Sequence, residues 1–328
     1  MSSEMSGAQG HGNVPALGGD KEGIRQGRRE NLVYLKQKIM RFCILLQCFW
    51  ASLVLLCSGE MFSAERNKAK LVDDGYNLIK DVSYVDDSET DEYKLERCKL
   101  DIYYPAGVKN FATLVWFHGG GLEAGNKDLP DELRNCGFAV VSVNYRLFPK
   151  GKCPDYIEDA AQAVAWTFEH ISEYGGTPDQ IYVSGHSAGG YLTLMVALAK
   201  EYMDEYGQDA DRIVKAYPIS GQTTTHYTIR KERGVNVDLP VIDSFAPSNN
   251  VRREGAPVVL ITGDRDKEML ARYEENAHLY SILRHFGHPA ELFEIEGFDH
   301  GNVRGPACYI IRDDIRRCWT EYIKGQNR

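Results

Sequence analysis

The sequence lacks the short motifs that mark several large classes of proteins. Its 328 residues contain no Gly-x-Gly-x-x-Gly fingerprint, no P-loop and no Cys-x-x-Cys pair, which leaves dinucleotide-binding, phosphate-loop and zinc-ribbon proteins without support. An excess of positive charge is missing as well. The formal net charge is −9, which argues against a nucleic-acid partner. No internal repeat is visible, and we expect neither a cofactor nor a metal.

The sequence also lacks the even number and regular spacing of cysteines that are typical of a disulfide framework. Three of its eight cysteines fall in a hydrophobic N-terminal segment, which leaves an odd number for the rest of the chain. The remaining five have irregular spacings: Cys98, Cys136, Cys153, Cys308 and Cys318. We expect most of them to be buried as small hydrophobic residues.

The first 60 residues differ from the rest of the chain. Residues 1–39 are rich in Gly, Ser and charge, have little hydrophobic pattern, and are interpreted as an unstructured extension. A basic flank then precedes an apolar run from Phe42 to Leu56, and small residues follow. A run of about 15 apolar residues is typical of a secretory signal peptide, since a spanning helix needs about 20. We therefore predict a signal peptide over residues 40–59 and a secreted or periplasmic protein.

Three alternatives for this segment stay open. One hypothesis is that translation starts at Met40, directly before Arg41, so that residues 1–39 are an artefact of the assigned start. Cys57 is a candidate for lipid modification, although Leu56 before it is not a small residue. The apolar run could instead be a buried core helix. Contact with a membrane follows only if residues 41–57 remain uncleaved.

From about residue 96 the chain alternates short apolar runs with helical patterns. This alternation predicts an α/β fold with a mostly parallel sheet and helices on both faces. We expect a single catalytic domain over residues 60–328. Strands are predicted at 99–104, 112–118, 138–145, 180–185, 213–220, 257–263 and 291–297, and helices at 155–171, after residue 187, and at 267–286 and 308–324. The polar, irregular segment 222–250 is predicted to be a short cap inserted over one end of the sheet.

A serine stands between glycines where a strand pattern gives way to a helix pattern. Gly185-His186-Ser187-Ala188-Gly189 fits Gly-x-Ser-x-Gly, a pattern that also occurs by chance in Gly/Ser turns. A serine hydroxyl is a poor nucleophile, so it needs a base, a group that orients the base, and donors for the oxyanion. Support for a nucleophilic Ser187 must therefore come from elsewhere in the chain.

Two further loops supply the donors and the base. The stretch "HGGG" (118–121) follows a predicted strand, and consecutive glycines let backbone N–H groups point into a site. His300 lies in a Gly-rich loop after the last predicted strand, at the end of the sheet where α/β proteins place their sites. His226, in the inserted segment, is the second choice as base. His118 and His186 are expected to brace the loops that contain them.

The acid that orients the base is predicted in "ITGDRDKEM" (261–269), at the end of another strand. Asp264 follows the strand directly, whereas Asp266 lies further into the loop. A carboxylate has to reach the far nitrogen of an imidazole on the next loop, which favours Asp266. Asp264 is then a turn residue whose side chain accepts from nearby backbone N–H groups. Asp299, beside His300, is a weaker third candidate.

Taken together, these motifs resemble the α/β-hydrolase family, and within it the His-Gly-Gly-Gly esterases of the hormone-sensitive-lipase-like and bacterial feruloyl-esterase-like groups. The resemblance covers residues 80–325 and includes "NYRLFPKGKCPDYIEDAAQAVAW" (144–166). It implies an α/β-hydrolase fold with Ser187 as nucleophile, His300 as base and, from a Gly-x-x-Asp pattern, Asp266 as acid. It also implies an oxyanion hole formed by the N–H groups of three residues: Gly120, Gly121 and Ala188.

Two positions qualify the resemblance. Glu158-Asp159 is interpreted as structural, bracing the start of a helix. Leu122 stands where many relatives of the bacterial group carry an aromatic residue, so the wall of their acyl pocket cannot be transferred to this chain.

The predicted function is hydrolysis of small carboxylic esters of short or aromatic acids through an acyl-enzyme. Arg230, Lys231 and Arg233 of the cap could meet an acidic substrate or form a solvated charged face. An amidase, an arylformamidase or a peptidase could use the same three residues. A non-catalytic binding module of this fold is the alternative from another class. The sequence does not indicate an oligomeric state.

Overall fold

The computed structural model describes residues 70–73 and 75–326. The predicted extension (1–39) and signal peptide (40–59) lie outside the described residues. Among the helices that are described, none has the length and apolar character needed to cross a membrane.

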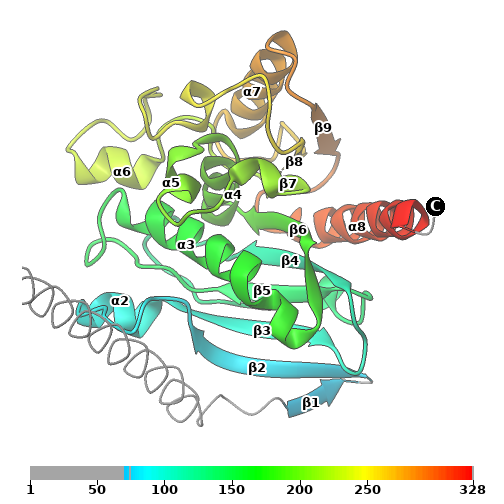
Figure 1. The fold of residues 1–328 in the computed structure, drawn as a ribbon. Coiled ribbons are helices and arrows are strands. Elements are labelled where there is room, and N and C mark those ends of the chain that lie inside the picture. Colours follow the sequence, from blue (N-terminus) through cyan, green and yellow to red (C-terminus); the bar gives the residue numbers. More distant parts are fainter. Residues whose placement is uncertain (1–69, 74, 327–328) are drawn as a thin grey trace, which may run out of the picture. The chain divides into compact units, whose positions relative to one another are not determined.

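A nine-stranded sheet forms the centre of the described chain (Figure 1). The strand order is β1-β2-β3-β5-β4-β6-β7-β8-β9. The first four strands in this order pair antiparallel, and all pairs from β5 onward are parallel. The strands are β1 (Lys70–Asp73), β2 (Tyr76–Ser83), β3 (Lys99–Pro105), β4 (Phe111–Phe117), β5 (Ala139–Val143), β6 (Gly176–His186), β7 (Lys215–Ile219), β8 (Val258–Gly263) and β9 (Ala290–Ile295).

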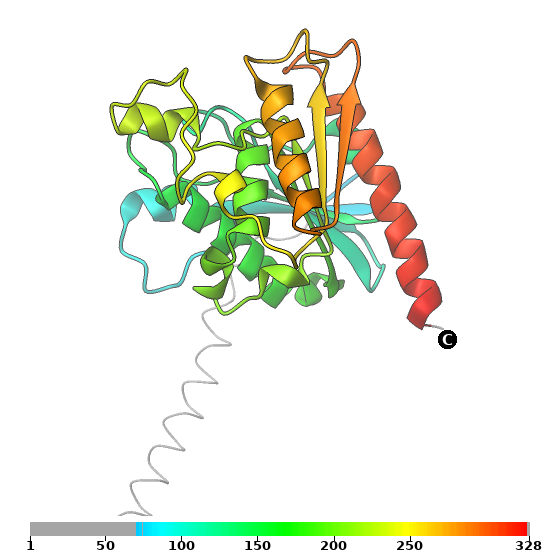
Figure 2. The ribbon, with the colours of Figure 1, turned by 90° about the horizontal axis from the view of Figure 1, so that it is seen from above.

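Helices cover both faces of this sheet, as the sequence predicts (Figures 1 and 2). The longer ones are α3 (Asp155–His170), α4 (Ala188–Leu198), α7 (Arg272–His285) and α8 (Arg304–Gln326), and the short ones are α2 (Glu92–Arg97), α5 (Glu201–Asp204) and α6 (Tyr227–Glu232). Single 3₁₀ turns occur at Asp131–Leu133, Ile171–Tyr174, Ala210–Arg212 and Pro247–Asn249. Apolar side chains of α3, α4 and α7 form one core on one face of the sheet. Those of α8 form a second core on the other face.

The strands form where apolar residues run continuously. Every residue of β4, β5 and β8 is buried, because helices cover the sheet on both sides. All seven predicted strands are present, with bounds shifted by a few residues. The sequence prediction missed β1 and β2 at the antiparallel edge, where half-buried and exposed residues break the apolar pattern.

The start of α7 was predicted five residues too early. The helix begins at Arg272 rather than at residue 267, and the residue before it, Ala271, is left-handed with φ 57°. The preceding loop turns back on itself, since the N–H groups of Lys267 and Glu268 both donate to the carbonyl of Asp264. This longer loop decides which carboxylate reaches the candidate site.

The inserted segment 222–250 is mostly irregular, as predicted, but part of it is ordered and buried. It contains the helix α6 and a buried stretch over residues 222–226. Four apolar side chains of its outer part are exposed: Val235, Val237, Leu239 and Ile242. The segment is therefore anchored to the domain on both sides of an outer part that presents apolar side chains to solvent.

Asp159 is structural, as predicted. Its carboxylate is buried and accepts from Nε and Nη2 of Arg146 at 2.9 and 2.7 Å, and from the backbone N–H of the same residue at 2.8 Å. The paired contacts tie the loop after β5 to the first turns of α3. The five described cysteines are free thiols, of which three are buried and two half-buried.

Candidate active site

Ser187 lies at the sharp turn between β6 and α4. Its backbone angles are φ 58° and ψ −114°, a left-handed conformation that a non-glycine residue adopts rarely. The glycines on either side are required by close contacts. A Cβ on Gly189 would lie 2.0 Å from the carbonyl oxygen of Phe117, and one on Gly185 would lie 2.6 Å from the same atom. The Gly-x-Ser-x-Gly pattern is thus explained by packing of the turn against β4.

His300 reaches Ser187 from the loop that connects β9 to α8. Its Nε2 atom lies 2.9 Å from the Ser187 hydroxyl oxygen. The carbonyl of His300 accepts from Nε2 of His186 at 2.7 Å, which fixes the backbone of this loop. The structure confirms that Ser187 and His300 are brought together and that His186 braces a loop.

The carboxylate on the far side of His300 belongs to Glu268. Nδ1 of the imidazole lies 2.8 Å from Oε2 of Glu268, whose side chain is fully buried. Because a carboxylate only accepts, Nδ1 carries the proton and Nε2 is free to accept from Ser187. The second oxygen, Oε1, accepts from the Ser220 hydroxyl and from the N–H of Gly263 at 3.0 Å. Glu268 is therefore held in place from both sides.

The prediction that Asp266 orients His300 is wrong in this structure. Asp266 is exposed in the loop after β8, as is Arg265, whereas Asp264 is half-buried. The loop then folds back, and the longer side chain of Glu268 extends beneath it to the imidazole. The sequence contained this residue in the same loop, but the helix predicted from residue 267 assigned it to the wrong element.

The other two aspartates have structural contacts. Asp264 accepts from the N–H of Asp266 at 3.0 Å and from that of Gly297 at 2.8 Å, which confirms it as a turn residue. Asp299 accepts from the N–H groups of Gly301 and Asn302, both at 2.9 Å. Neither carboxylate is hydrogen-bonded to His300.

Hydrogen bonds keep Glu268 ionised in spite of its burial. Burial by itself would raise the pKa of this carboxyl group. The hydrogen bonds from His300, Ser220 and the N–H of Gly263 outweigh that effect and lower the pKa to about 2. The group is therefore a carboxylate at neutral pH.

The Gly-Gly-Gly loop lies beside the serine. A Cβ on Gly119 would be 3.4 Å from the Cβ of Ser187. Within the described part of the chain, the N–H groups of Gly120, Gly121 and Ala188 donate to no backbone carbonyl and to no side chain. Three unengaged donors next to one hydroxyl are what an oxyanion hole requires.

The remaining histidines of the sequence prediction lie away from the hydroxyl of Ser187. Nδ1 of His118 donates to the carbonyl of Gly119 at 2.6 Å, and its ring stacks on Tyr145, so it braces the glycine loop as predicted. Burial lowers its pKa to about 4. His226, the second choice as base, is buried beside Tyr191 and Tyr227, and its Nδ1 accepts from the N–H of Thr228.

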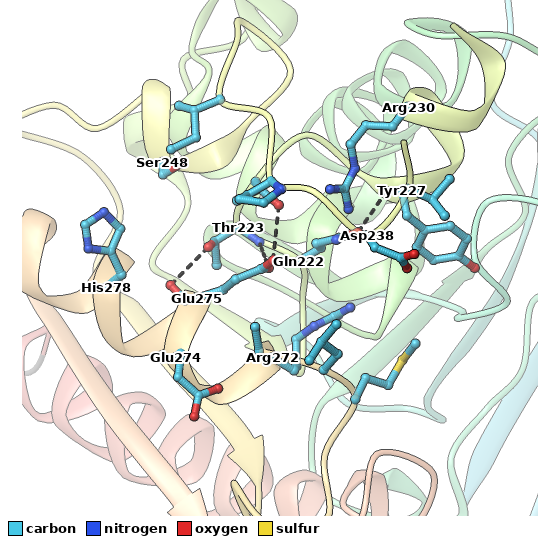
Figure 3. A pocket seen from close by; sticks show the side chains of 17 residues that line it. Gln222, Thr223, Tyr227, Arg230, Asp238, Ser248, Arg272, Glu274, Glu275 and His278 are labelled. Carbon is cyan, nitrogen blue, oxygen red and sulfur yellow. Dashed lines mark hydrogen bonds between the residues drawn. The ribbon is translucent and has the colours of Figure 1, made fainter. Parts of the chain in front are cut away.

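A cavity of about 530 Å³ is lined by residues of the inserted segment, of the loop before α7 and of α7 itself (Figure 3). Tyr227 lines the cavity, and its hydroxyl oxygen would lie 1.9 Å from a Cβ on Gly121. Met269 lines it too, directly after Glu268. Tyr227 thus brings the cavity beside the glycine loop, whereas Ser187, Glu268 and His300 do not themselves line it. Leu122 takes no part in it, because its side chain is fully buried in the core.

The fold and the placement of Ser187 and His300 after parallel strands define an α/β hydrolase. Solved structures support this class: a carbohydrate esterase from gut microbiota superposes with a TM-score of 0.60, at 18% identity, over 77% of this chain and 98% of that one. Esterase B from Lactobacillus rhamnosis gives 0.60 at 20% identity, over 86% and 96%. Within the class, residues 100–283 match the BD-FAE family, and the chain belongs to that family.

Relatives found by sequence similarity match this chain over shorter stretches than these solved structures do. The probable carboxylic ester hydrolase LipM of Mycobacterium tuberculosis is 37% identical over 117 residues, 33% of this chain and 27% of its own. A probable isoprenylcysteine alpha-carbonyl methylesterase of Oryza sativa is 28% identical over 247 residues, 67% of this chain and 58% of its own. The chain thus spans between about a quarter and three fifths of the length of these relatives.

Proposed function

We propose that the protein is a serine hydrolase that cleaves small carboxylic esters of short or aromatic acids. The observation that carries the proposal is the pair of hydrogen bonds made by His300, one to Ser187 at 2.9 Å and one to Glu268 at 2.8 Å. Two relatives from Mycobacterium tuberculosis, the probable carboxylic ester hydrolase LipM and the carboxylesterase NlhH, support an ester as the substrate.

The geometry suggests a definite course for the reaction. Oγ of Ser187 forms a bond to the ester carbonyl carbon while its proton passes to Nε2 of His300. The N–H groups of Gly120, Gly121 and Ala188 bind the oxyanion of the tetrahedral intermediate. That intermediate expels the alcohol, which takes the proton from Nε2. Water then attacks the acyl-enzyme by the same route, releasing the acid and restoring the Ser187 hydroxyl.

The size of the cavity predicts which esters are cleaved fastest. Each methylene that becomes buried adds about 0.8 kcal/mol, or roughly a fourfold gain in kcat/KM, until the cavity of about 530 Å³ is filled. We expect nitrophenyl esters of acids up to about six carbons to be preferred over long ones, with a fall beyond that length. A chain-length series from acetate to palmitate measures this. Efficient cleavage of emulsified long-chain triglyceride contradicts it, and absence of turnover on every ester contradicts the proposed function.

We propose in addition that the protein is exported by the segment 40–59. The support is the basic flank followed by an apolar run of the length of a signal peptide. N-terminal sequencing of protein recovered from outside the cytoplasm is expected to find a start between Ser58 and Arg66. An intact Met1 on that protein contradicts cleavage.

A further inference from the structure

Two arginines enter the cavity beside the candidate active site. Figure 3 shows Arg230 coming from the cap and Arg272 from the α7 side, with their guanidinium groups on opposite sides of the same space. Each side chain is only 4% exposed. Much of the remaining wall is apolar, from Val237, Pro240, Ile242, Met269 and Leu270. The cavity therefore combines an apolar lining with two buried positive charges.

Neither arginine is neutralised by an ion pair. No carboxylate of the described residues lies within 4.0 Å of either guanidinium group. Arg230 donates from Nη1 to the carbonyl of Leu239, and Arg272 donates from Nη1 to the carbonyl of Ser220. The Nε atom of both residues is buried and has no hydrogen-bond partner.

Buried cations without a partner are costly, so they call for an explanation. Withdrawing a charge from water costs several kcal/mol unless an opposite charge or a full set of hydrogen bonds compensates. Burial lowers the pKa of both Arg230 and Arg272 from the usual value, yet a guanidinium stays protonated at neutral pH. One carbonyl per guanidinium fixes its position but leaves most of its donors without a partner, and no carboxylate among the described residues forms a direct ion pair with it.

The neighbouring basic residues of α6 show the ordinary arrangement. Lys231 pairs with Glu123 at 2.8 Å and Arg233 with Asp243 at 2.7 Å, and both basic side chains are more than a third exposed. Lys231 and Arg233 therefore belong to a solvated charged face, one of the two alternatives considered from the sequence. Only Arg230 of this trio turns into the cavity.

The acidic residues that line the cavity do not form ion pairs with Arg230 or Arg272. Asp238 and Glu274 are exposed at its rim, where water screens their charge. Glu275 is half-buried and its charge acts on both arginines, but its carboxylate forms no ion pair with either and accepts instead from the N–H of Thr223 and the hydroxyl of Thr224. These rim charges disfavour a dianion and leave room for a single negative charge between the arginines.

We propose that Arg230 and Arg272 bind a carboxylate carried by the ester substrate, so that the preferred substrates are esters with a free acid group. The proposal rests on the proposed function and narrows its substrate class. A guanidinium matches a carboxylate with two parallel hydrogen bonds, which gives both affinity and orientation. The apolar wall would hold the carbon chain that links the carboxylate to the ester group.

Matched ester pairs test this assignment. Monoethyl glutarate carries the carboxylate in the acid part and is compared with ethyl pentanoate. 4-Acetoxybutanoate carries it in the alcohol part and is compared with butyl acetate. The rate of acid release is measured by titration at constant pH for wild type, Arg230→Gln, Arg230→Lys and the control Arg233→Gln. Arg272 is left unchanged, because it holds Ser220, which contacts Glu268.

We expect wild type to prefer at least one carboxylate ester over its neutral partner. Loss of a charged hydrogen-bonded pair is worth about 1.5 to 3 kcal/mol, so Arg230→Gln should lower the ratio of the two kcat/KM values by roughly 10- to 100-fold. Arg230→Lys should keep part of the preference, and Arg233→Gln all of it. The pair in which the preference is found identifies the side of the ester that bears the carboxylate.

Two results overturn the proposal. One is a wild-type enzyme that favours neither carboxylate ester, and the other is an Arg230→Gln variant whose ratio is unchanged. If no ester is hydrolysed, the proposed function fails, and calorimetric titration with glutarate decides the inference separately. Binding of glutarate to wild type that is lost in Arg230→Gln supports the carboxylate site, whereas no binding to wild type contradicts it.

Discussion

Replacing Ser187 with alanine is expected to reduce kcat for nitrophenyl acetate by roughly 10⁶-fold, the loss seen when a serine nucleophile is removed from a triad that acts as a unit. The expected effect is large because no other hydroxyl is hydrogen-bonded to Nε2 of His300 among the described residues. Only the slow attack of water assisted by the oxyanion donors would remain.

The same substitution should leave the fold intact. Ser187 begins α4 without capping it through its side chain, so alanine removes one hydroxyl and no backbone contact. Thermal unfolding of the variant measures this. A purified variant that keeps more than a few per cent of the wild-type rate would show that Ser187 is not the nucleophile.

Replacing Glu268 with glutamine is expected to lower kcat by roughly 10⁴-fold, by analogy with the acid of a serine protease triad. The oxygen of the new amide can still accept from Ser220 and Gly263. Its NH₂ group then faces Nδ1 of His300, which must accept rather than donate. The imidazole proton moves to Nε2, the atom that has to take the proton of Ser187.

Two aspartate variants provide the controls. Asp266→Asn should stay within about twofold of wild type, since its side chain is exposed and away from His300. Asp264→Asn should cost about tenfold or less, through the turn that its carboxylate stabilises. If the kcat of Asp266→Asn falls as far as that of Glu268→Gln, the assignment of Glu268 as the acid is contradicted.

Glu268 also links stability to acid pH. Its pKa of about 2 lies below the usual 4.5, so its charge stabilises the folded chain fully above about pH 4.5. That contribution is lost as the pH falls through 2. Glu268→Gln should therefore flatten the dependence of the free energy of unfolding on pH between these values.

Much of the fold follows from local sequence patterns. The buried parallel strands, such as β4 and β8, are continuous apolar runs, which is why they were predicted from the sequence. The strands β1 and β2 lie at an edge where residues alternate less clearly, and the short helix α6 is set by its contacts rather than by periodicity. Such elements depend on tertiary packing that a local pattern does not contain.

The candidate site likewise has residues that could be predicted from the sequence and one that could not. Ser187 and the glycine loop carry motifs whose spacing reflects close backbone contacts, and His300 lies in the loop after a strand, so all three could be found in the sequence. The acid could not, because Asp266 and Glu268 lie two residues apart in one loop. The choice between them depends on how far that loop runs before α7 begins at Arg272.

The central claim is that Ser187, His300 and Glu268 form one nucleophilic site, and covalent labelling tests it most directly. Purified wild-type protein is treated with a fluorophosphonate probe, and the adduct is located by peptide mass spectrometry. We predict a single adduct on Ser187, no labelling of Ser187→Ala, and much slower labelling of Glu268→Gln than of Asp266→Asn. An unlabelled wild type, or an adduct on another serine, would contradict the account.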